Sequence, residues 1–198
     1  MSMDERPISQ ACINNQQPIL DIIQPLFTDV DEVFEIGSGT GQHAVYFGKA
    51  MPHLRWQCAD LSQHHAGINA WREWAQLANV LAPLVFDANK LWPIDKTSAI
   101  FCANVIHIIA WPEAEKLFAG IAMHLRSPGV VCFYGPYNYN GKFTSESNAH
   151  FDQWLKDRDP RSGIRDFEKV DALAREAGLT LQADHAMPAN NRCLVWRL

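Results

Sequence analysis

The residues best placed to do chemistry in this chain are three closely spaced glycines and the acidic residue before them. Gly37, Gly39 and Gly41 follow the apolar run 33–36, which contains Glu35. A strand that leads through a glycine turn into a helix is a common nucleotide-binding corner, because glycine lets a ligand approach the main chain closely. The spacing is neither that of a dinucleotide site nor, lacking a following Lys-Ser or Lys-Thr pair, that of a P-loop. A carboxylate beside the turn would repel a pyrophosphate, so the pattern favours a cationic or zwitterionic adenosine ligand.

Polar residues also follow three later apolar runs. Asp60, Asp87 and Asn104 each stand at the end of such a run. In open α/β sheets the carboxyl ends of the strands share one crevice, which is where ligands bind. Asp60 lies about 20 residues beyond Gly37, where an acidic side chain can bind both ribose hydroxyls, and Asp87 is placed to accept from an adenine amino group. S-adenosylmethionine fits this pattern, with S-adenosylhomocysteine as its product.

Together these residues resemble the class I S-adenosylmethionine-dependent methyltransferases. Four further segments resemble a small methyltransferase-like family with bacterial and animal members and no assigned substrate. These segments are residues 15–20, 134–137, 140–148 and 187–191. The resemblance runs from about residue 11 to the C-terminus, with one departure at Asn14, where an arginine is expected. The expected cofactor-binding residues are Glu35, Gly37, Ser38, Gly39, Asp60, Leu61, Asp87, Ala88 and Asn104.

His107 and Asn104 are the expected catalytic residues. The His107 imidazole could take a proton from the nucleophile that attacks the sulfonium methyl. Its alternative role is packing on the adenine, because proximity alone supplies much of the rate of such reactions. Asn104 is followed by Val105 rather than by the Pro-Pro-aromatic run of enzymes that methylate nucleobase amines, and no Pro-Cys nucleophile is present. Neither type of nucleobase methylation is therefore favoured.

The segment from about residue 135 to 165 is longer than the fold requires, since a crossover from strand to helix usually takes a few residues. It leaves the carboxyl end of the strand expected at 130–134, beside the expected cofactor, and loops placed there often carry specificity. Aromatic, amide and guanidinium groups suit a small polar or anionic substrate. An insertion without a binding role is the alternative. The expected substrate-binding residues are Tyr137, Asn138, Asn148, Arg165 and Asn191.

Strand patterns alternate with helix patterns along the rest of the chain, which predicts parallel βαβ units. Helices are expected at residues 15–27, 41–51, 64–78, 112–125, 147–158 and 167–177. The runs 179–184 and 193–197 form a closing hairpin. The prediction is one domain over residues 1–198 with a three-layer Rossmann-like methyltransferase fold. Its seven-stranded sheet is mostly parallel, with an antiparallel last strand.

Composition limits the partners of the chain. Its 198 residues are 47% apolar and carry a net charge of -5, which fits a globular protein and argues against nonspecific nucleic-acid binding. There is no long apolar run and no secretory signal, so neither a membrane span nor export is expected. The five cysteines indicate buried thiols in a reducing cytoplasm, and the eight histidines show no metal-binding array. A small-molecule substrate is the expected partner, and no oligomeric state is predicted.

Two other functions stay open. One is a scaffold protein of the same fold that binds the cofactor without turnover. The other is a nicotinamide-dependent oxidoreductase, which the glycine spacing and Glu35 disfavour. For the methyltransferase, the accepting atom is oxygen, nitrogen or sulfur.

Overall fold

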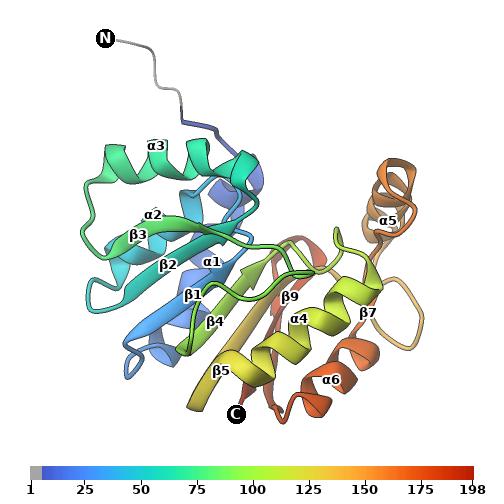
Figure 1. Cartoon of the computed structure of the whole chain (residues 1–198). Helices are drawn as coiled ribbons and strands as arrows, with labels where there is room; N and C mark the ends of the chain where they lie inside the picture. Colours follow the sequence, from blue (N-terminus) through green and yellow to red (C-terminus); the bar gives the residue numbers. More distant parts are fainter. Residues whose placement is uncertain (1–5) are drawn as a thin grey trace.

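The computed structural model describes residues 6–198 and is built around a seven-stranded sheet (Figure 1). The strands of this sheet are β1 (Glu32–Ile36), β2 (Arg55–Asp60), β3 (Val80–Val85), β4 (Thr97–Ala103), β5 (Leu125–Gly135), β8 (Thr180–Met187) and β9 (Asn191–Arg197). Their order in the sheet is β3-β2-β1-β4-β5-β9-β8. All neighbours pair in parallel except β9, which is antiparallel to both β5 and β8. The predicted Rossmann-like sheet with an antiparallel last strand is confirmed.

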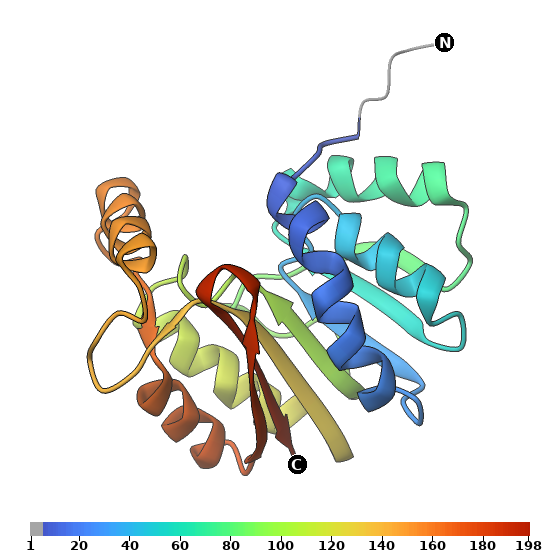
Figure 2. The same ribbon diagram turned by 180° about the vertical axis from the view of Figure 1, so that it is seen from behind.

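Helices cover both faces of the sheet (Figure 2). They are α1 (Gln10–Leu26), α2 (Gln42–Ala50), α3 (His65–Ala75), α4 (Trp111–His124), α5 (Glu146–Arg158) and α6 (Phe167–Glu176), with short 3-10 turns at Ser62–His64 and Pro188–Asn190. Side chains of α1, α2 and α3 pack on one face, and those of α4 and α6 pack on the other. Helix α5 stands apart from both layers (Figure 1).

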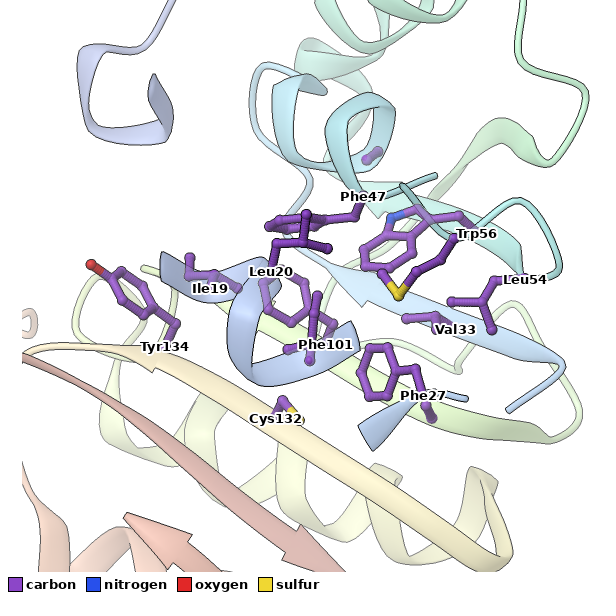
Figure 3. Close-up of a cluster of buried hydrophobic side chains, with 14 of the residues drawn as sticks. Ile19, Leu20, Phe27, Val33, Phe47, Leu54, Trp56, Phe101, Cys132 and Tyr134 are labelled. Atoms are coloured by element: carbon purple, nitrogen blue, oxygen red, sulfur yellow. The ribbon is translucent and has the colours of Figure 1, made fainter. Parts of the chain in front are cut away.

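Each face of the sheet carries its own apolar core, because successive side chains of a strand point to opposite faces. On the α1–α2 side, the rings of Phe47, Trp56 and Phe101 lie 5.4–5.8 Å apart (Figure 3). On the α4–α6 side, the ring of Phe133 packs 5.8 Å from that of Trp196. The two cores fix the sheet and therefore the position of its carboxyl edge. Four cysteines are buried here, as predicted: Cys58, Cys102, Cys132 and Cys193.

The two ends of the segment from residue 135 to 165 pair with each other in a separate two-stranded sheet. Its first residues form β6 (Tyr137–Asn138) and its last pair with them in β7 (Arg165–Asp166). The helix α5 between them begins at the N-cap Ser145, whose hydroxyl accepts from the Asn148 amide. This pairing holds α5 beside the carboxyl ends of the strands.

Candidate functional site

A cavity of about 1030 Å³ lies at the carboxyl edge of the sheet. Its wall includes the residues that follow β1, β2 and β4, the first turn of α1, helix α5 and the turn before β9. The volume is at the upper end of the range for small-molecule sites. It is enough for a nucleoside-sized ligand together with a second small molecule.

The wall divides into two parts, which we name for the elements that form them. The glycine half consists of Gly37, Ser38, Gly39, Asp60, Leu61, Asp87 and Ala88. The α5 half consists of Tyr134, Ser147, Asn148, Phe151, Trp154 and Asn191. Asn104 and His107 also line the cavity.

The glycine turn presents bare main chain to the cavity. The amides of Gly37 and Ser38 donate to the Ala59 carbonyl at 2.9 and 3.1 Å, which ties the turn to the end of β2. Gly39 has a φ of +56°, and a side chain added there would meet no atom within 4 Å. At Gly41 a side chain would instead lie 2.8 Å from the main chain of Ile68 in α3. The turn therefore needs glycine at Gly41 for packing, and at Gly39 it leaves open space for a ligand.

Asp60 joins the end of β2 to this turn. Its two carboxylate oxygens accept from the backbone amides of Gly39 and Leu61, each at 2.7 Å. A carboxylate has about four acceptor positions, so two remain for a ligand. Asp87 lines the same half after β3, where one of its oxygens accepts from the Asn89 amide at 2.8 Å.

The charged side chains that line the cavity are acidic. Besides Asp60 and Asp87 they include Glu113, whose carboxylate accepts from the Ala110 amide at 2.9 Å. No lysine or arginine within residues 6–198 lines the cavity. The wall is therefore suited to cationic and neutral ligands and unsuited to a pyrophosphate.

Asn104 and His107 meet at the ends of β4 and β5. Asn104 has a φ of +59°, an uncommon backbone conformation that asparagine tolerates, and its amide donates to the Tyr134 carbonyl at 2.8 Å. A side chain added at Gly135 would lie 3.4 Å from His107 Nδ1 and 3.7 Å from Asn104 Oδ1. The two side chains therefore lie close to each other beside Gly135.

The His107 side chain is buried and keeps a polar atom free. Its Nδ1 has no hydrogen-bond partner within the described chain, and its ring lies 5.4 Å from that of Phe151 in α5. Burial, and secondarily the charge of Arg165, lower the pKa of His107 to about 4. The imidazole is therefore neutral at physiological pH. A buried polar atom without a partner is costly to the folded state.

Glu35 does not line the cavity, although the sequence predicts it as a cofactor-binding residue. Strand alternation turns it away from Phe34 and Ile36, which pack on the α4–α6 side, and toward the α1–α2 side. There the carboxyl group is fully buried and accepts from Trp56 Nε1 at 3.0 Å. Its role is to hold β1 against β2 beneath the glycine turn.

Replacing Glu35 with glutamine is expected to change how stability depends on pH. Burial raises the pKa of Glu35 from 4.5 to about 7, so the folded state keeps a proton that the unfolded state releases. The resulting stability is present below about pH 4.5 and is lost as the pH rises through 7, by up to about 1.4 kcal/mol per pH unit. Denaturant unfolding at several pH values should show this loss in the wild type and not in Glu35→Gln. Parallel profiles for the two proteins would contradict the assignment.

Three of the predicted substrate residues also lie away from the cavity. Tyr137 is fully buried in the α4–α6 core, and Asn138 is buried with its side chain donating to the Ile164 carbonyl. The Arg165 guanidinium donates to the backbone carbonyls of Ile106, Ile109 and Arg161. The β6–β7 pairing causes this, because it places all three residues at the base of the segment that carries α5. Asn148 and Asn191, by contrast, line the α5 half.

Sequence reasoning missed a polar network formed by Asn15, His43 and Tyr134 in the cavity wall. His43 Nε2 donates to Asn15 Oδ1 at 2.7 Å, since an amide oxygen only accepts. Burial raises the pKa of the Tyr134 hydroxyl, and hydrogen bonds from Asn15 and Asn191 oppose that rise. The tyrosine ring is part of the α1–α2 core, and its hydroxyl points away from that core (Figure 3). Asn15 and Tyr134 both fall in segments that carry the family resemblance, which is the signal that could have found them.

Two features are absent from residues 6–198. No three histidine, cysteine or acidic side chains are grouped so that they could hold a metal ion. No helix in the same range is both long and apolar enough to cross a membrane.

One protein-family model matches this chain over residues 6–198. Its description is "Protein of unknown function (DUF938)".

Solved methyltransferase structures share the fold. An O-methyltransferase family protein from Burkholderia thailandensis has a TM-score of 0.80 at 15% identity, covering 94% of this chain and 57% of its own. The mitomycin 7-O-methyltransferase MmcR has a TM-score of 0.83 at 16% identity, and the match covers 94% of this chain and 54% of MmcR. An O-methyltransferase family 2 protein from Planctomyces limnophilus, solved in complex with apigenin, has a TM-score of 0.76 at 14% identity. That match covers 86% of this chain and 52% of the other protein. This chain spans a little over half the length of these proteins, and at such identities the likeness shows the fold.

Proposed function

Because the chain belongs to the DUF938 family, whose description assigns no activity, we propose its function from the cavity itself. The chain transfers a methyl group from S-adenosylmethionine to a small molecule. The observation that carries this proposal is the glycine half, where bare main chain at Gly39 lies beside the Asp60 carboxylate and no cation lines the wall among the described residues.

The residues present fit this cofactor. The open face of Gly39 admits a ligand against the main chain, and Asp60 keeps acceptor positions for the two ribose hydroxyls. Asp87 and Ala88 line the same half and would flank the adenine. An acidic wall favours a ligand of net positive charge over a dinucleotide, which would bring two phosphate charges to a site without a lysine or arginine in the described part of the chain.

When bound, S-adenosylmethionine supplies a methyl group activated by its sulfonium. Asn104 and His107, which both line the cavity, would hold the accepting hydroxyl, amine or thiol against that group. The new bond from the accepting atom to the methyl carbon would replace the carbon–sulfur bond, whose electron pair would stay on sulfur. The acceptor proton passes to the neutral His107 or to water. With its lowered pKa His107 is a weak base, so orientation supplies most of its effect.

The segment from 135 to 165 would act as the cover of this site. Helix α5 places Asn148, Phe151 and Trp154 on the cavity wall, and the β6–β7 pairing fixes the base of the segment. The closed volume would exclude water from the transfer. We propose that residues 1–198 act as one methyltransferase domain with this cover, and that Asn148 and Asn191 contact the acceptor.

A labelling experiment tests turnover. The protein is incubated with a metabolite extract and S-adenosylmethionine whose methyl group carries a heavy isotope, and products are followed by mass spectrometry. The proposal expects new methylated small molecules with the wild type and none with a heat-inactivated control. Binding of the cofactor without any labelled product would instead favour a scaffold protein.

A further inference from the structure

We propose that the molecule methylated here is ring-bearing, carries its own hydroxyl or N–H donors, and has no negative charge. This inference rests on the proposed function and concerns the α5 half of the cavity. The sequence predicts a small polar or anionic substrate with Arg165 in its site, and this inference excludes the anionic case.

No lysine or arginine of the described residues lines the α5 half, and the Arg158 guanidinium lies 4.6 Å from the centroid of the Trp154 ring without being a lining residue. The Arg165 guanidinium donates hydrogen bonds to three backbone carbonyls, and Arg192 forms an ion pair with Asp184 at 2.7 Å. His43 and His107 both line the cavity and stay neutral, because burial lowers the pKa of each to about 4. An anionic group would have to leave water without a charge partner, at a cost of several kcal/mol.

The polar atoms left for a ligand are mainly acceptors. Asn148 donates its two amide hydrogens to Thr144 Oγ1 at 2.8 Å and to the Asn190 carbonyl at 3.2 Å, which leaves only its oxygen. His107 adds a neutral imidazole to the same cavity, and its neighbour Asn104 adds an amide oxygen. Tyr134 adds a hydroxyl to the wall, which can donate as well as accept. A carboxylate or phosphate, which only accepts, finds few partners here, whereas hydroxyl and N–H groups find several.

Aromatic rings form one wall of the same half. Phe151 and Trp154 lie on successive turns of α5 and are stacked, with ring centroids 5.7 Å apart and planes at 17°. The Phe151 ring also contacts the His107 imidazole edge-on, at 72°. A flat ring could pack against these aromatic side chains while its hydroxyl reaches His107. One ligand would then contact both the aromatic wall and the polar groups.

Three phenols with short side arms of different charge test the proposal. They are para-hydroxybenzyl alcohol (neutral), tyramine (cationic) and para-hydroxyphenylacetate (anionic). Dissociation constants are measured by NMR titration, with and without S-adenosylhomocysteine. We expect the neutral and cationic phenols to bind at least about tenfold more tightly than the anion, which reflects the unpaired desolvation of the carboxylate.

Two lysine variants locate the effect. Ser147 is exposed and lines the α5 half, so Ser147→Lys places a cation at the α5 half without disturbing the core. It should narrow or invert the preference against the anion. Thr180→Lys adds the same charge at an exposed position of β8 that does not line the cavity, and it should leave the preference unchanged.

Each outcome decides part of the inference. Equal or tighter binding of the anion by the wild type would overturn the charge assignment, and binding of none of the three phenols would overturn the ring assignment. Equal effects of the two lysine variants would show that the preference against the anionic phenol does not arise in the α5 half. Failure to bind S-adenosylhomocysteine would contradict the proposed function alone, because the titrations without it still measure the preference of the cavity.

Discussion

Replacing Gly39 with valine is expected to reduce binding of S-adenosylhomocysteine below the limit of detection by calorimetry. A valine at this position projects into the open space that the glycine turn leaves for the ligand. It also has to adopt a φ of +56°, which a β-branched residue tolerates poorly. Binding should be lost while thermal unfolding remains cooperative, because the added side chain meets no protein atom within 4 Å.

Gly141→Val is the matched control for backbone strain. Gly141 has a φ of +69°, an equally open side-chain position and no place on the cavity wall. This variant should lose about 1–3 kcal/mol of stability and bind S-adenosylhomocysteine normally. Normal binding by a folded Gly39→Val variant would show that the turn faces away from the ligand.

Replacing Asp60 with alanine is expected to weaken cofactor binding by about 1.5–3 kcal/mol, the cost of removing a charged hydrogen-bond partner. The same change removes the acceptor for the Gly39 and Leu61 amides, so stability should fall as well. Calorimetric dissociation constants and denaturation curves are needed together to separate the two effects.

Asp60→Asn separates the proposed contact of the Asp60 carboxylate with the cofactor from its hydrogen bonds to the glycine turn. Its amide oxygen can still accept from one backbone N–H, so we expect a stability between those of the wild type and the alanine variant, with binding still impaired. An unchanged dissociation constant in a folded Asp60→Ala protein would mean that this carboxylate does not contact the cofactor.

The strand pattern was enough to predict the sheet, because a parallel sheet covered on both faces needs continuous apolar runs. Helix boundaries were less predictable. The first helix was expected from residue 15, near Pro18, but α1 begins at Gln10, because the Ser9 hydroxyl caps it by accepting from the Cys12 amide. The two prolines within α1 do not stop it.

The strand-end acids Asp60 and Asp87 were predictable as cavity residues because they follow strands directly. Glu35 was not, since the alternation of side chains within β1 turns its carboxyl group beneath the turn. Tyr134 was missed for a related reason. Its place in an apolar strand indicates a core residue, and its ring is one, but the hydroxyl reaches the cavity.

The segment that carries α5 was the least predictable part. Its excess length indicates a cover, yet its two ends pair as β6 and β7, a contact between residues 28 positions apart. Such pairing has no local sequence signature. It buries Tyr137 and Asn138 and leaves Asn148 on the cavity wall. Of the two asparagines, therefore, only Asn148 can contact a ligand, and residue type alone does not distinguish them.

Calorimetric titration of the wild-type protein with S-adenosylhomocysteine and with NAD tests the central claim most directly. The acidic, cation-free wall of the described cavity and the open turn at Gly39 predict saturable one-to-one binding of S-adenosylhomocysteine and no detectable binding of NAD. Tighter binding of NAD than of S-adenosylhomocysteine would contradict the account.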